Sequence, residues 1–195
     1  MDLIERAFGK LIEFLEKENY KGYDPYDTLN SWLPFHWIGK MGPVLAIQFQ
    51  KRNPLNIRPL IGIKKEINPK AFGLFLLIFS RLYSKTGREE YRQQATLFFN
   101  WLIENQSPGY SGAGWGYNFP WASTEKYLER YVPSAVVTGF VCRGINEYFK
   151  ISGDQKAAET IISAGKFIMN DLPVHQDAHG ICISYTPVKK LYKIF

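Results

Sequence analysis

Residues 72–119 read FGLFLLIFSRLYSKTGREEYRQQATLFFNWLIENQSPGYSGAGWGYNF, and this stretch can be laid over a later part of the chain with one fixed offset and no gaps. Gly87, for example, matches Gly153, which gives an offset of 66 residues (153 − 87 = 66). The other matched pairs are Gly73 with Gly139, Tyr83 with Phe149, Trp101 with Phe167, Gly114 with Gly180, and Phe119 with Tyr185. Repetition at a fixed period indicates stacked supersecondary units that cover one another's apolar surface and carry equivalent loops on one side. The repeat therefore locates a candidate site as well as a fold.

Helix signals divide each repeat into two helices. Asn68 and Pro69 form a good helix start, with Asn as the N-cap and Pro in the first turn, and Gly87 ends this helix. The corresponding helix of the second unit opens at residues 132–134 and ends at Gly153. Together with two helices before the repeat, the sequence predicts helices at residues 2–18, about 37–52, 69–86, 88–105, about 133–152 and 154–171.

The predicted helices differ in how their apolar residues are distributed. Residues 71–83, AFGLFLLIFSRLY, are apolar on nearly every face, so we expect this helix to be buried all round. The next helix has a one-sided apolar stripe, and the second unit repeats the alternation. Inner helices that are sandwiched and outer helices that face water are typical of an all-α fold of the α/α-hairpin toroid type, as in six-hairpin glycosidases.

The predicted helices make about three hairpins, whereas a closed ring of this kind has about six. We therefore expect one domain, residues 1–195, that forms about the N-terminal half of a toroid and stops after Phe195, where another helix would be expected. An open flank of apolar inner helices favours association. A homo-oligomer or a second half-toroid is thus an expected partner.

Composition limits the function classes. The net charge of +6 would permit contact with polyanions, but the Lys and Arg pairs lie far apart in the sequence, so we expect solvated surface charge and no nucleic-acid partner. We see no secretory signal and no run that could span a bilayer. Cys142 and Cys182 lack a metal-binding or redox spacing. The expected location is the cytoplasm, without a cofactor.

The loop at residues 22–31, GYDPYDTLNS, carries two carboxylates and two phenols held by a stiff proline. Cleavage of a glycosidic bond needs a pair of carboxylates, so Asp24 and Asp27 are the candidate catalytic acid and base. Tyr23 and Asn30 of the same loop are candidate ligand contacts. Short acidic side chains also cap turns and helix starts, and this interpretation of Asp24 and Asp27 stays open.

The loop at residues 109–121, GYSGAGWGYNFPW, combines alternating glycines with aromatic residues. Glycine lets the backbone approach a ligand closely, and flat rings can stack on sugar C–H surfaces. A nucleotide site is not indicated, because no strand precedes the glycines and no Lys-Ser or Lys-Thr follows them. An aromatic plug that only packs over the end of the helices is the alternative. The candidate ligand contacts in this loop are Trp115, Tyr117, Asn118 and Trp121.

The loop at residues 180–187, GICISYTP, is the period-mate of the aromatic loop. Tyr185 aligns with Phe119 and is a further candidate ligand contact, and alternating Ile181 and Ile183 predict a short strand or hairpin. His175 and His179 are four residues apart, but they fall in a loop rather than on a helix, so we do not expect a metal site.

These residues resemble a largely uncharacterised group of prokaryotic α/α-toroid proteins, which are similar to the six-hairpin glycosidase superfamily and are often encoded among genes for surface-polysaccharide synthesis. The resemblance covers nearly the whole chain and implies a fold and a carbohydrate context rather than a reaction. Two features depart from it: residues 122–124 are Ala-Ser-Thr where a Gln-Ser-Arg-like segment is expected, and the chain ends early. The segments that carry the resemblance are GYDPYD (22–27), NPK (68–70), GYSG (109–112), WGYNF (115–119), PS (133–134), GIC (180–182) and SYTP (184–187).

The sequence therefore favours a carbohydrate-active or carbohydrate-binding protein of polysaccharide metabolism, with a carbohydrate as its ligand. Fold alone does not settle the activity, because toroids host several chemistries. Two alternatives remain: a non-catalytic scaffold of a glycan-assembly system, and an isoprenoid-handling toroid. The second is disfavoured because Asp24 to Asp27 is not an Asp-Asp-x-x-Asp cluster.

Overall fold

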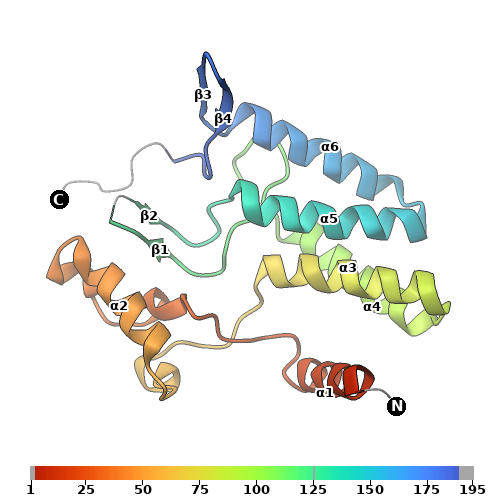
Figure 1. Ribbon diagram of the computed structural model, residues 1–195, viewed down its shortest axis with the longest axis horizontal. Coiled ribbons are helices and arrows are strands. Elements are labelled where there is room, and N and C mark those ends of the chain that lie inside the picture. The colour runs from red at the N-terminus through yellow and green to blue at the C-terminus, as the bar shows by residue number, and fades with distance from the viewer. Residues whose placement is uncertain (1–2, 125, 189–195) are drawn as a thin grey trace.

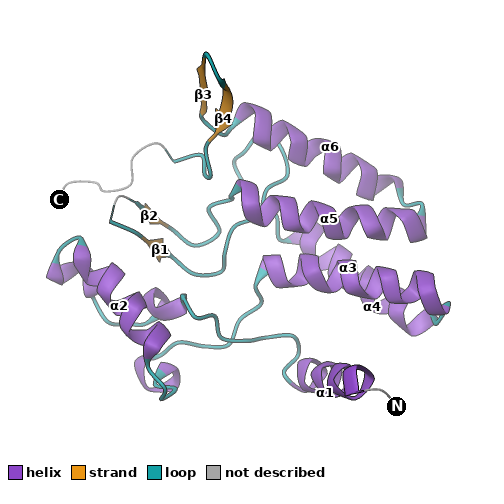
Figure 2. Ribbon diagram, viewed as in Figure 1, coloured by secondary structure: helices purple, strands orange, loops and turns teal. Residues whose placement is uncertain are grey.

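The computed structural model describes residues 3–124 and 126–188, and within them the chain is mainly helical. The helices form a layered array, with short strand pairs and loops at one end of it (Figures 1 and 2). The α-helices are α1 (Leu3–Lys17), α2 (Met41–Arg52), α3 (Pro69–Thr86), α4 (Glu89–Glu104), α5 (Ala135–Ser152) and α6 (Gln155–Asn170). Short 3-10 helices η1 (Asp27–Asn30), η2 (Phe35–Ile38) and η3 (Arg58–Ile61) lie before α3. The all-α class predicted from the sequence is confirmed.

In the helical part of the repeat, equivalent helices are offset by the full 66 residues at both ends. Helices α3 and α5 start and end 66 residues apart, and so do α4 and α6. Gly87 and Gly153 end α3 and α5 with φ of +67° and +65°, a left-handed conformation that favours glycine. The side chains of Asn68 and Ser134, also period-mates, accept backbone N–H groups as N-caps. Capping residues at equivalent positions therefore start and end the central helices of the two hairpins.

Helices α3 and α5 form the centre of the array, with α4 packed on α3 and α6 on α5. The two central helices approach so closely that a Cβ on Gly144 would lie 2.2 Å from the carbonyl oxygen of Gly73. Tyr20, just after α1, covers one end of this core and meets the rings of Phe72 and Phe98 edge-on. The fully buried core side chains include Leu76, Phe98, Phe99, Leu102, Trp115, Val137, Val141 and Ile145.

The first two helices differ from the expectation. They lie on opposite sides of the molecule and do not form a hairpin (Figure 1), so the described residues contain two helical hairpins rather than three. The helix expected from about residue 37 is interrupted, because Gly39 adopts φ +78° after η2 and α2 starts only at Met41. The predicted end of this helix at Asn53 is confirmed.

The expectation that the inner helices are buried all round is wrong. Ile78 on α3 and Val136 and Phe149 on α5 are partly open to solvent, so both helices keep a polar or open strip. The more extensive exposed apolar surface lies instead around α2. No helix in the described part of the chain is long and apolar enough to cross a bilayer.

Two small antiparallel pairs complete the fold. Strands β1 (Trp121–Ala122) and β2 (Tyr127–Leu128) pair beside the helix ends, and β3 (Val174–Asp177) and β4 (Gly180–Ile183) form an exposed hairpin after α6. The short strand predicted around Ile181 and Ile183 is thus confirmed. Both loops of the repeat lie at the end of the array where α3 and α5 begin (Figure 1).

Candidate functional site

A cavity of about 540 Å³ lies at the N-terminal ends of the central helices. Its walls come from the loop before η1, from the start of α3, from the loops of both repeats, and from the β1–β2 pair. Loops that are remote in sequence meet here because the 66-residue repeat returns the chain to the same end of the array. The lining residues are Asp24, Pro25, Tyr26, Asn68, Lys70, Tyr117, Phe119, Trp121, Leu128 and Tyr185.

Asp24 is the carboxylate that lines the cavity among the described residues. Its Oδ1 accepts the backbone N–H of Tyr26 at 3.0 Å, and its Oδ2 accepts the Asn68 side-chain amide at 3.3 Å. Asn68 also caps α3, because its Oδ1 accepts the N–H of Lys70 at 3.0 Å. The same asparagine therefore starts the helix and orients the carboxylate.

Burial raises the pKa of Asp24 above its ordinary value, and the nearby Asp27 carboxylate adds to the increase. Hydrogen bonds from the Tyr26 backbone and from Asn68, with the charge of Arg58, oppose it. A carboxyl group with a raised pKa holds its proton to a higher pH, which is the property that a general acid needs. Asp24 therefore holds its proton to a higher pH than an ordinary aspartate and faces the cavity.

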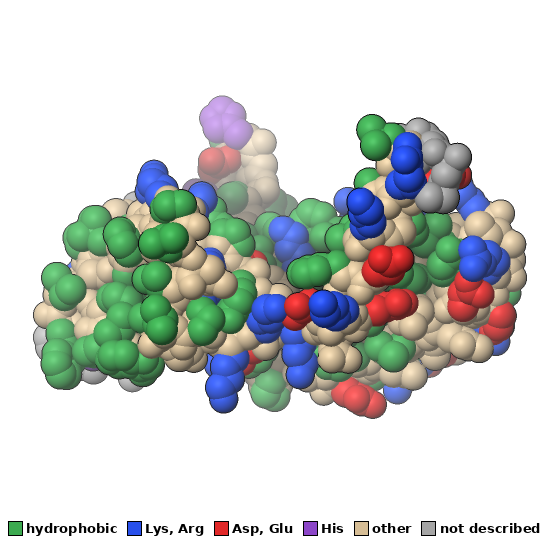
Figure 3. Space-filling view, turned by 90° about the horizontal axis from the view of Figure 1, so that it is seen from below, with side chains coloured by type: hydrophobic (Ala, Val, Ile, Leu, Met, Phe, Trp, Pro, Cys, Tyr) green, Lys and Arg blue, Asp and Glu red, His purple; other side chains and the backbone are tan. Residues whose placement is uncertain are grey.

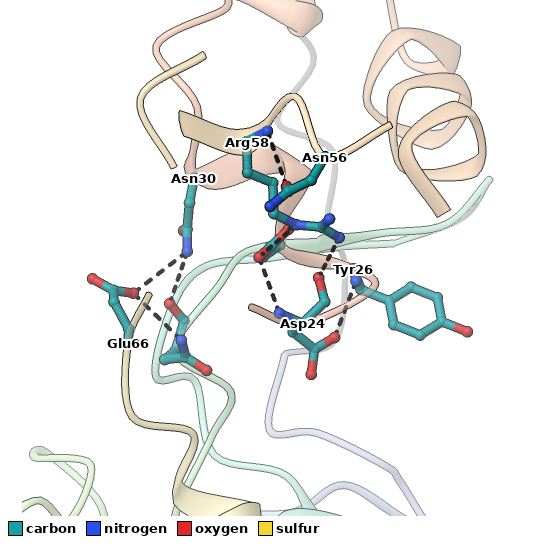
Figure 4. Close-up of polar contacts among 8 residues, drawn as sticks. Asp24, Tyr26, Asn30, Asn56, Arg58 and Glu66 are labelled. Carbon is teal, nitrogen blue, oxygen red and sulfur yellow. Dashed lines mark hydrogen bonds and ion pairs between the residues drawn. The ribbon is translucent and has the colours of Figure 1, made fainter. Parts of the chain in front are cut away.

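Asp27 does not line the cavity, although we expected it to form a catalytic pair with Asp24. It is only 3% exposed, and Nε of Arg58 donates to both of its oxygens at 2.8 and 3.1 Å (Figure 4). Asp27 Oδ2 also accepts the backbone N–H of Asp24 at 3.0 Å, while Arg58 donates to the Asp24 carbonyl at 3.0 Å. Both carboxylates accept a backbone N–H within the loop, as the capping alternative expected, and Asp27 is in addition clamped between two loops by Arg58.

Glu66 connects a second set of loops through its backbone and its carboxylate. Its backbone forms an isolated antiparallel bridge with Gly22, and Arg130 donates to both carboxylate oxygens at 2.9 and 2.8 Å. The side-chain amides of Asn30 and Asn118 approach Glu66 Oε2 at 3.5 and 3.4 Å (Figure 4). Asn30 also donates to the backbone carbonyl of Asn118 at 3.3 Å. The expected ligand contacts Asn30 and Asn118 thus join loops and do not line the cavity.

Aromatic rings make up much of the cavity wall. Tyr117 and Phe119 stack with ring centroids 5.0 Å apart, and Trp121 of β1 lies opposite Leu128 of β2 in the strand register. Tyr185 and Tyr117 line the same cavity, and each influences the pKa of the other. Phe119 and Tyr185, which are period-mates, therefore enclose one space.

The two phenols remain protonated over a wide pH range. Burial raises the pKa of Tyr117 and of Tyr185, with smaller contributions from Asp24 to Tyr117 and from Tyr117 to Tyr185. Both can donate O–H hydrogen bonds to a ligand. Lys70, whose Nζ lies 4.5 Å from the centre of the Phe140 ring, adds a positive charge. The cavity thus combines ring faces, hydroxyl donors, an amide, a cation and a carboxyl group.

The expectation that Trp115 offers a ring face to a ligand is wrong, because this side chain is 0% exposed. Its indole N–H donates to the Leu102 carbonyl at 2.9 Å, and its backbone N–H donates to Thr138 Oγ1 at 3.1 Å. Trp115 belongs to the core and holds the aromatic loop to α4 and α5. The alternative interpretation, in which the aromatic side chain only packs against the helices, is correct for Trp115.

The glycines of the aromatic loop do not open it toward a ligand. A Cβ on Gly112 would lie 1.9 Å from the Ser163 carbonyl oxygen, and one on Gly116 would lie 2.1 Å from that of Val132. These glycines allow the loop to press against α6 and against the segment before α5. The glycines were expected to let the backbone approach a ligand, and at Gly112 and Gly116 the backbone instead approaches other protein backbone.

The structure brings together four of the expected site residues, Asp24, Tyr117, Trp121 and Tyr185, in one cavity. Tyr23 does not line it, and its ring instead lies beside the guanidinium of Arg58 at 5.4 Å. Sequence reasoning missed Asn68 and Lys70 as site residues: it used Asn68 to start a helix and Lys70 only as part of the NPK segment that carries the resemblance. The signal was present, because Asn68 is the period-mate of Ser134 and both lie where the repeat loops return. The ionic partners Arg58, Glu66 and Arg130 carry no local signal.

Within residues 3–124 and 126–188, no three His, Cys, Asp or Glu side chains are placed to share a metal ion. His175 and His179 are exposed at the β3–β4 hairpin. No model of a known protein family matches this chain, and no curated protein matches it.

Proposed function

We propose that the cavity beside Asp24 binds a saccharide. The observation that carries this proposal is that the cavity combines aromatic rings with polar side chains. The rings of Tyr117 and Phe119 stack on each other, and Trp121 also lines the cavity. The polar groups belong to Asp24, Asn68 and Lys70. Rings stack on sugar C–H faces, while amide, phenol and charged groups bind hydroxyls. A volume of about 540 Å³ is in the usual range for small-molecule sites.

The finer fold is part of the same proposal. We take the α3–α4 and α5–α6 hairpins as two consecutive hairpins of an α/α toroid, because α3 and α5 pack together as an inner pair and the repeat is regular. The resemblance to toroid proteins of polysaccharide gene clusters supports this assignment. A cytoplasmic location is also proposed, and the free thiol of the exposed Cys182 supports a reducing compartment.

Binding is better supported than hydrolysis. Glycosidic hydrolysis with a carboxylate pair needs two carboxyl groups across the bond, and Asp27 is held by Arg58 outside the cavity. The raised pKa of Asp24 favours a second candidate function, proton transfer to or from a bound sugar, with the neutral phenols of Tyr117 and Tyr185 as hydrogen-bond donors. The scaffold alternative predicts neither binding nor turnover.

Calorimetric titration with a panel of soluble oligosaccharides tests the binding proposal. We expect at least one class to bind, and Trp121→Ala to weaken it roughly tenfold, which corresponds to about 1.4 kcal/mol. The matched control is Trp37→Ala, which removes an exposed indole that does not line the cavity. Equal losses in both variants, or no binding by a folded protein across the panel, would contradict saccharide binding.

Turnover separates the two candidate functions. With any saccharide that binds, Asp24→Asn is expected to abolish product formation while leaving the dissociation constant within a few-fold of the wild type. Binding without product in the wild type supports a purely binding role.

A further inference from the structure

The net positive charge of the chain comes from one segment. Residues 28–65 contain no Asp or Glu and six Lys or Arg, whereas outside them 24 − 6 = 18 Lys and Arg are balanced by 18 Asp and Glu. The whole formal excess of +6 therefore belongs to the segment that holds η2, α2 and η3. Its cations are Lys40, Lys51, Arg52, Arg58, Lys64 and Lys65.

The same segment exposes large apolar side chains. Trp37 is 81% and Trp32 70% exposed, which is unusual for the largest side chain in proteins. Figure 3 shows hydrophobic side chains gathered on the left part of the molecule, which contains α2 in Figure 1, with Lys and Arg at the edge. We name this set the α2 surface: Trp32, Trp37, Ile38, Met41, Leu45, Phe49, Leu55 and Leu60.

Helix α2 carries apolar residues on both its inner and its outer face. Pro43 and Ile47 point inward and are buried, whereas Met41, Leu45 and Phe49 recur at every fourth residue on the outer face and are exposed. A surface helix of a globular protein ordinarily has a polar outer face. A contiguous apolar patch of this kind marks an interaction site.

The α2 surface is held in place by the fold. The backbone N–H of Trp32 donates to the Ile61 carbonyl at 3.3 Å, and the indole lies so close to Gly62 that a Cβ there would be 2.8 Å from Cδ1. A Cβ on Gly42 would lie 2.0 Å from the Phe35 carbonyl oxygen, so η2 and α2 are joined tightly. The exposed rings are therefore presented on a defined scaffold.

The net positive charge of residues 28–65 indicates which kind of partner can bind to the α2 surface. Arg58 and Lys65 are paired with Asp27 and Glu18, which lie outside the segment, whereas Lys51, Arg52 and Lys64 are exposed beside the α2 surface. A second copy of the chain on this surface would bring these three cations against the same three, and like charges across an interface are unfavourable. A nucleic acid would use the cations but not the exposed aliphatic side chains. A bilayer with anionic headgroups uses both, because Trp favours the membrane interface and Lys and Arg bind acidic lipids.

We propose that the α2 surface docks on an anionic lipid bilayer, with the rings of Trp32, Trp37 and Phe49 in the interface and the flanking cations on the headgroups. The protein would lie on the membrane without crossing it. The surface adjoins the cavity, since Lys51 donates to the Tyr26 hydroxyl at 2.7 Å and Tyr26 lines the cavity. The docking proposal is nevertheless independent of saccharide binding.

Vesicle flotation tests the proposal with the full chain. We expect the wild type to float with vesicles of phosphatidylcholine and phosphatidylglycerol, to float much less with phosphatidylcholine alone, and to be released as salt rises. Replacing Trp37→Ser together with Phe49→Ser should lower the partition coefficient roughly tenfold or more, because two apolar side chains no longer enter the interface. Arg52→Gln with Lys64→Gln should reduce binding to the anionic vesicles alone.

A control and two contrary outcomes complete the test. Ile162→Ser with Met169→Ser removes two exposed apolar side chains from α6 and should leave flotation unchanged. Circular dichroism checks that each variant is folded. Absence of flotation with anionic vesicles overturns the proposal, and so does an equal loss in the α6 control. Self-association that Trp37→Ser abolishes, measured by light scattering without vesicle binding, would assign the surface to a second copy instead.

Discussion

The two parts of the molecule differ in how their structure is specified. Helices α3 to α6 form two hairpins whose bounds repeat at 66 residues, with equivalent N-caps and equivalent left-handed glycines. The region before α3 has only one long helix after α1, several 3-10 turns, and an apolar surface that faces outward. The first part is built on a packed core and the second on a few long-range ionic and hydrogen-bonding contacts.

Local sequence signals specify the structure of the repeat but not that of the region before α3. In the repeat, each helix boundary is marked by its own cap, and the core side chains follow the helical period. In the region before α3, the positions of Asp24 and Asn30 depend on Arg58, Glu66 and Arg130, which are 34 or more residues away. We therefore expect core substitutions to unfold the whole molecule and clamp substitutions to loosen the N-terminal region first.

The largest expected effect comes from Trp115→Ala. The side chain is fully buried and its N–H is paired with Leu102, so its loss leaves a cavity and an unpaired carbonyl. We expect the free energy of unfolding to fall by about 3–5 kcal/mol, measured by urea denaturation. The control Trp37→Ala should change it by about 0.5 kcal/mol or less, because that ring is exposed. Similar losses in the two variants would remove the distinction between core and exposed rings.

Asp27→Asn is expected to have the next largest effect. Burial raises the pKa of Asp27 although Arg58 opposes the shift, so neutralising Asp27 recovers part of its desolvation cost. The nearly buried Arg58 is then left without a charged partner, and we expect a net loss of up to about 3 kcal/mol. Hydrogen exchange should show faster opening of residues 22–31 and 56–63 than of α3 and α5. Arg58→Gln made in the Asp27→Asn background should cost less than Arg58→Gln alone. Additive effects would show that the clamp is not a coupled unit.

Gly87→Ala and Gly153→Ala sharpen the comparison within the repeat. Both residues have positive φ, and a Cβ at either would meet nothing within 4 Å, so strain in the backbone is the expected penalty. We expect each variant to lose about 1 kcal/mol, measured by thermal unfolding, and the two losses to be equal within error. A clearly larger loss at one glycine would mean that the two hairpins are not energetically equivalent.

The smallest expected effect is a gain in stability from Asp24→Asn. Because burial raises the pKa of Asp24, the folded protein binds this proton more tightly than the unfolded chain does. The stabilisation is fully present below the ordinary pKa of 3.8 and is lost as the pH rises through the raised value. At pH 7 the variant should therefore be more stable than the wild type, by at most about 1 kcal/mol.

The pH dependence provides the check on that assignment. The difference in melting temperature between Asp24→Asn and the wild type should shrink toward zero as the pH falls below about 4. Asp27 is present in both proteins, so the difference reports mainly on position 24. A gain that stays constant down to acid pH would contradict a titrating Asp24.

Sequence reasoning predicted that the loops of the repeat meet at one end, and in the structure they do. The return of two loops to one end placed Tyr117, Trp121 and Tyr185 together, and the loop composition pointed to Asp24. It failed where one residue type has two equally plausible partners. Asp27 could face a substrate or an arginine, and Trp115 could face a sugar or a core, and neither choice is encoded in the neighbouring residues.

The sequence alone specified the helical class, the approximate boundaries of the four helices of the repeat, and the end of the molecule at which the loops meet. These depend on caps, glycine conformation and apolar period, which act over a few residues. Only the tertiary structure decided that Arg58 binds Asp27, that Glu66 joins Asn30 with Asn118, and that α1 and α2 separate. Those outcomes follow from burial and from contacts between residues far apart in the chain, which no local sequence signal specifies.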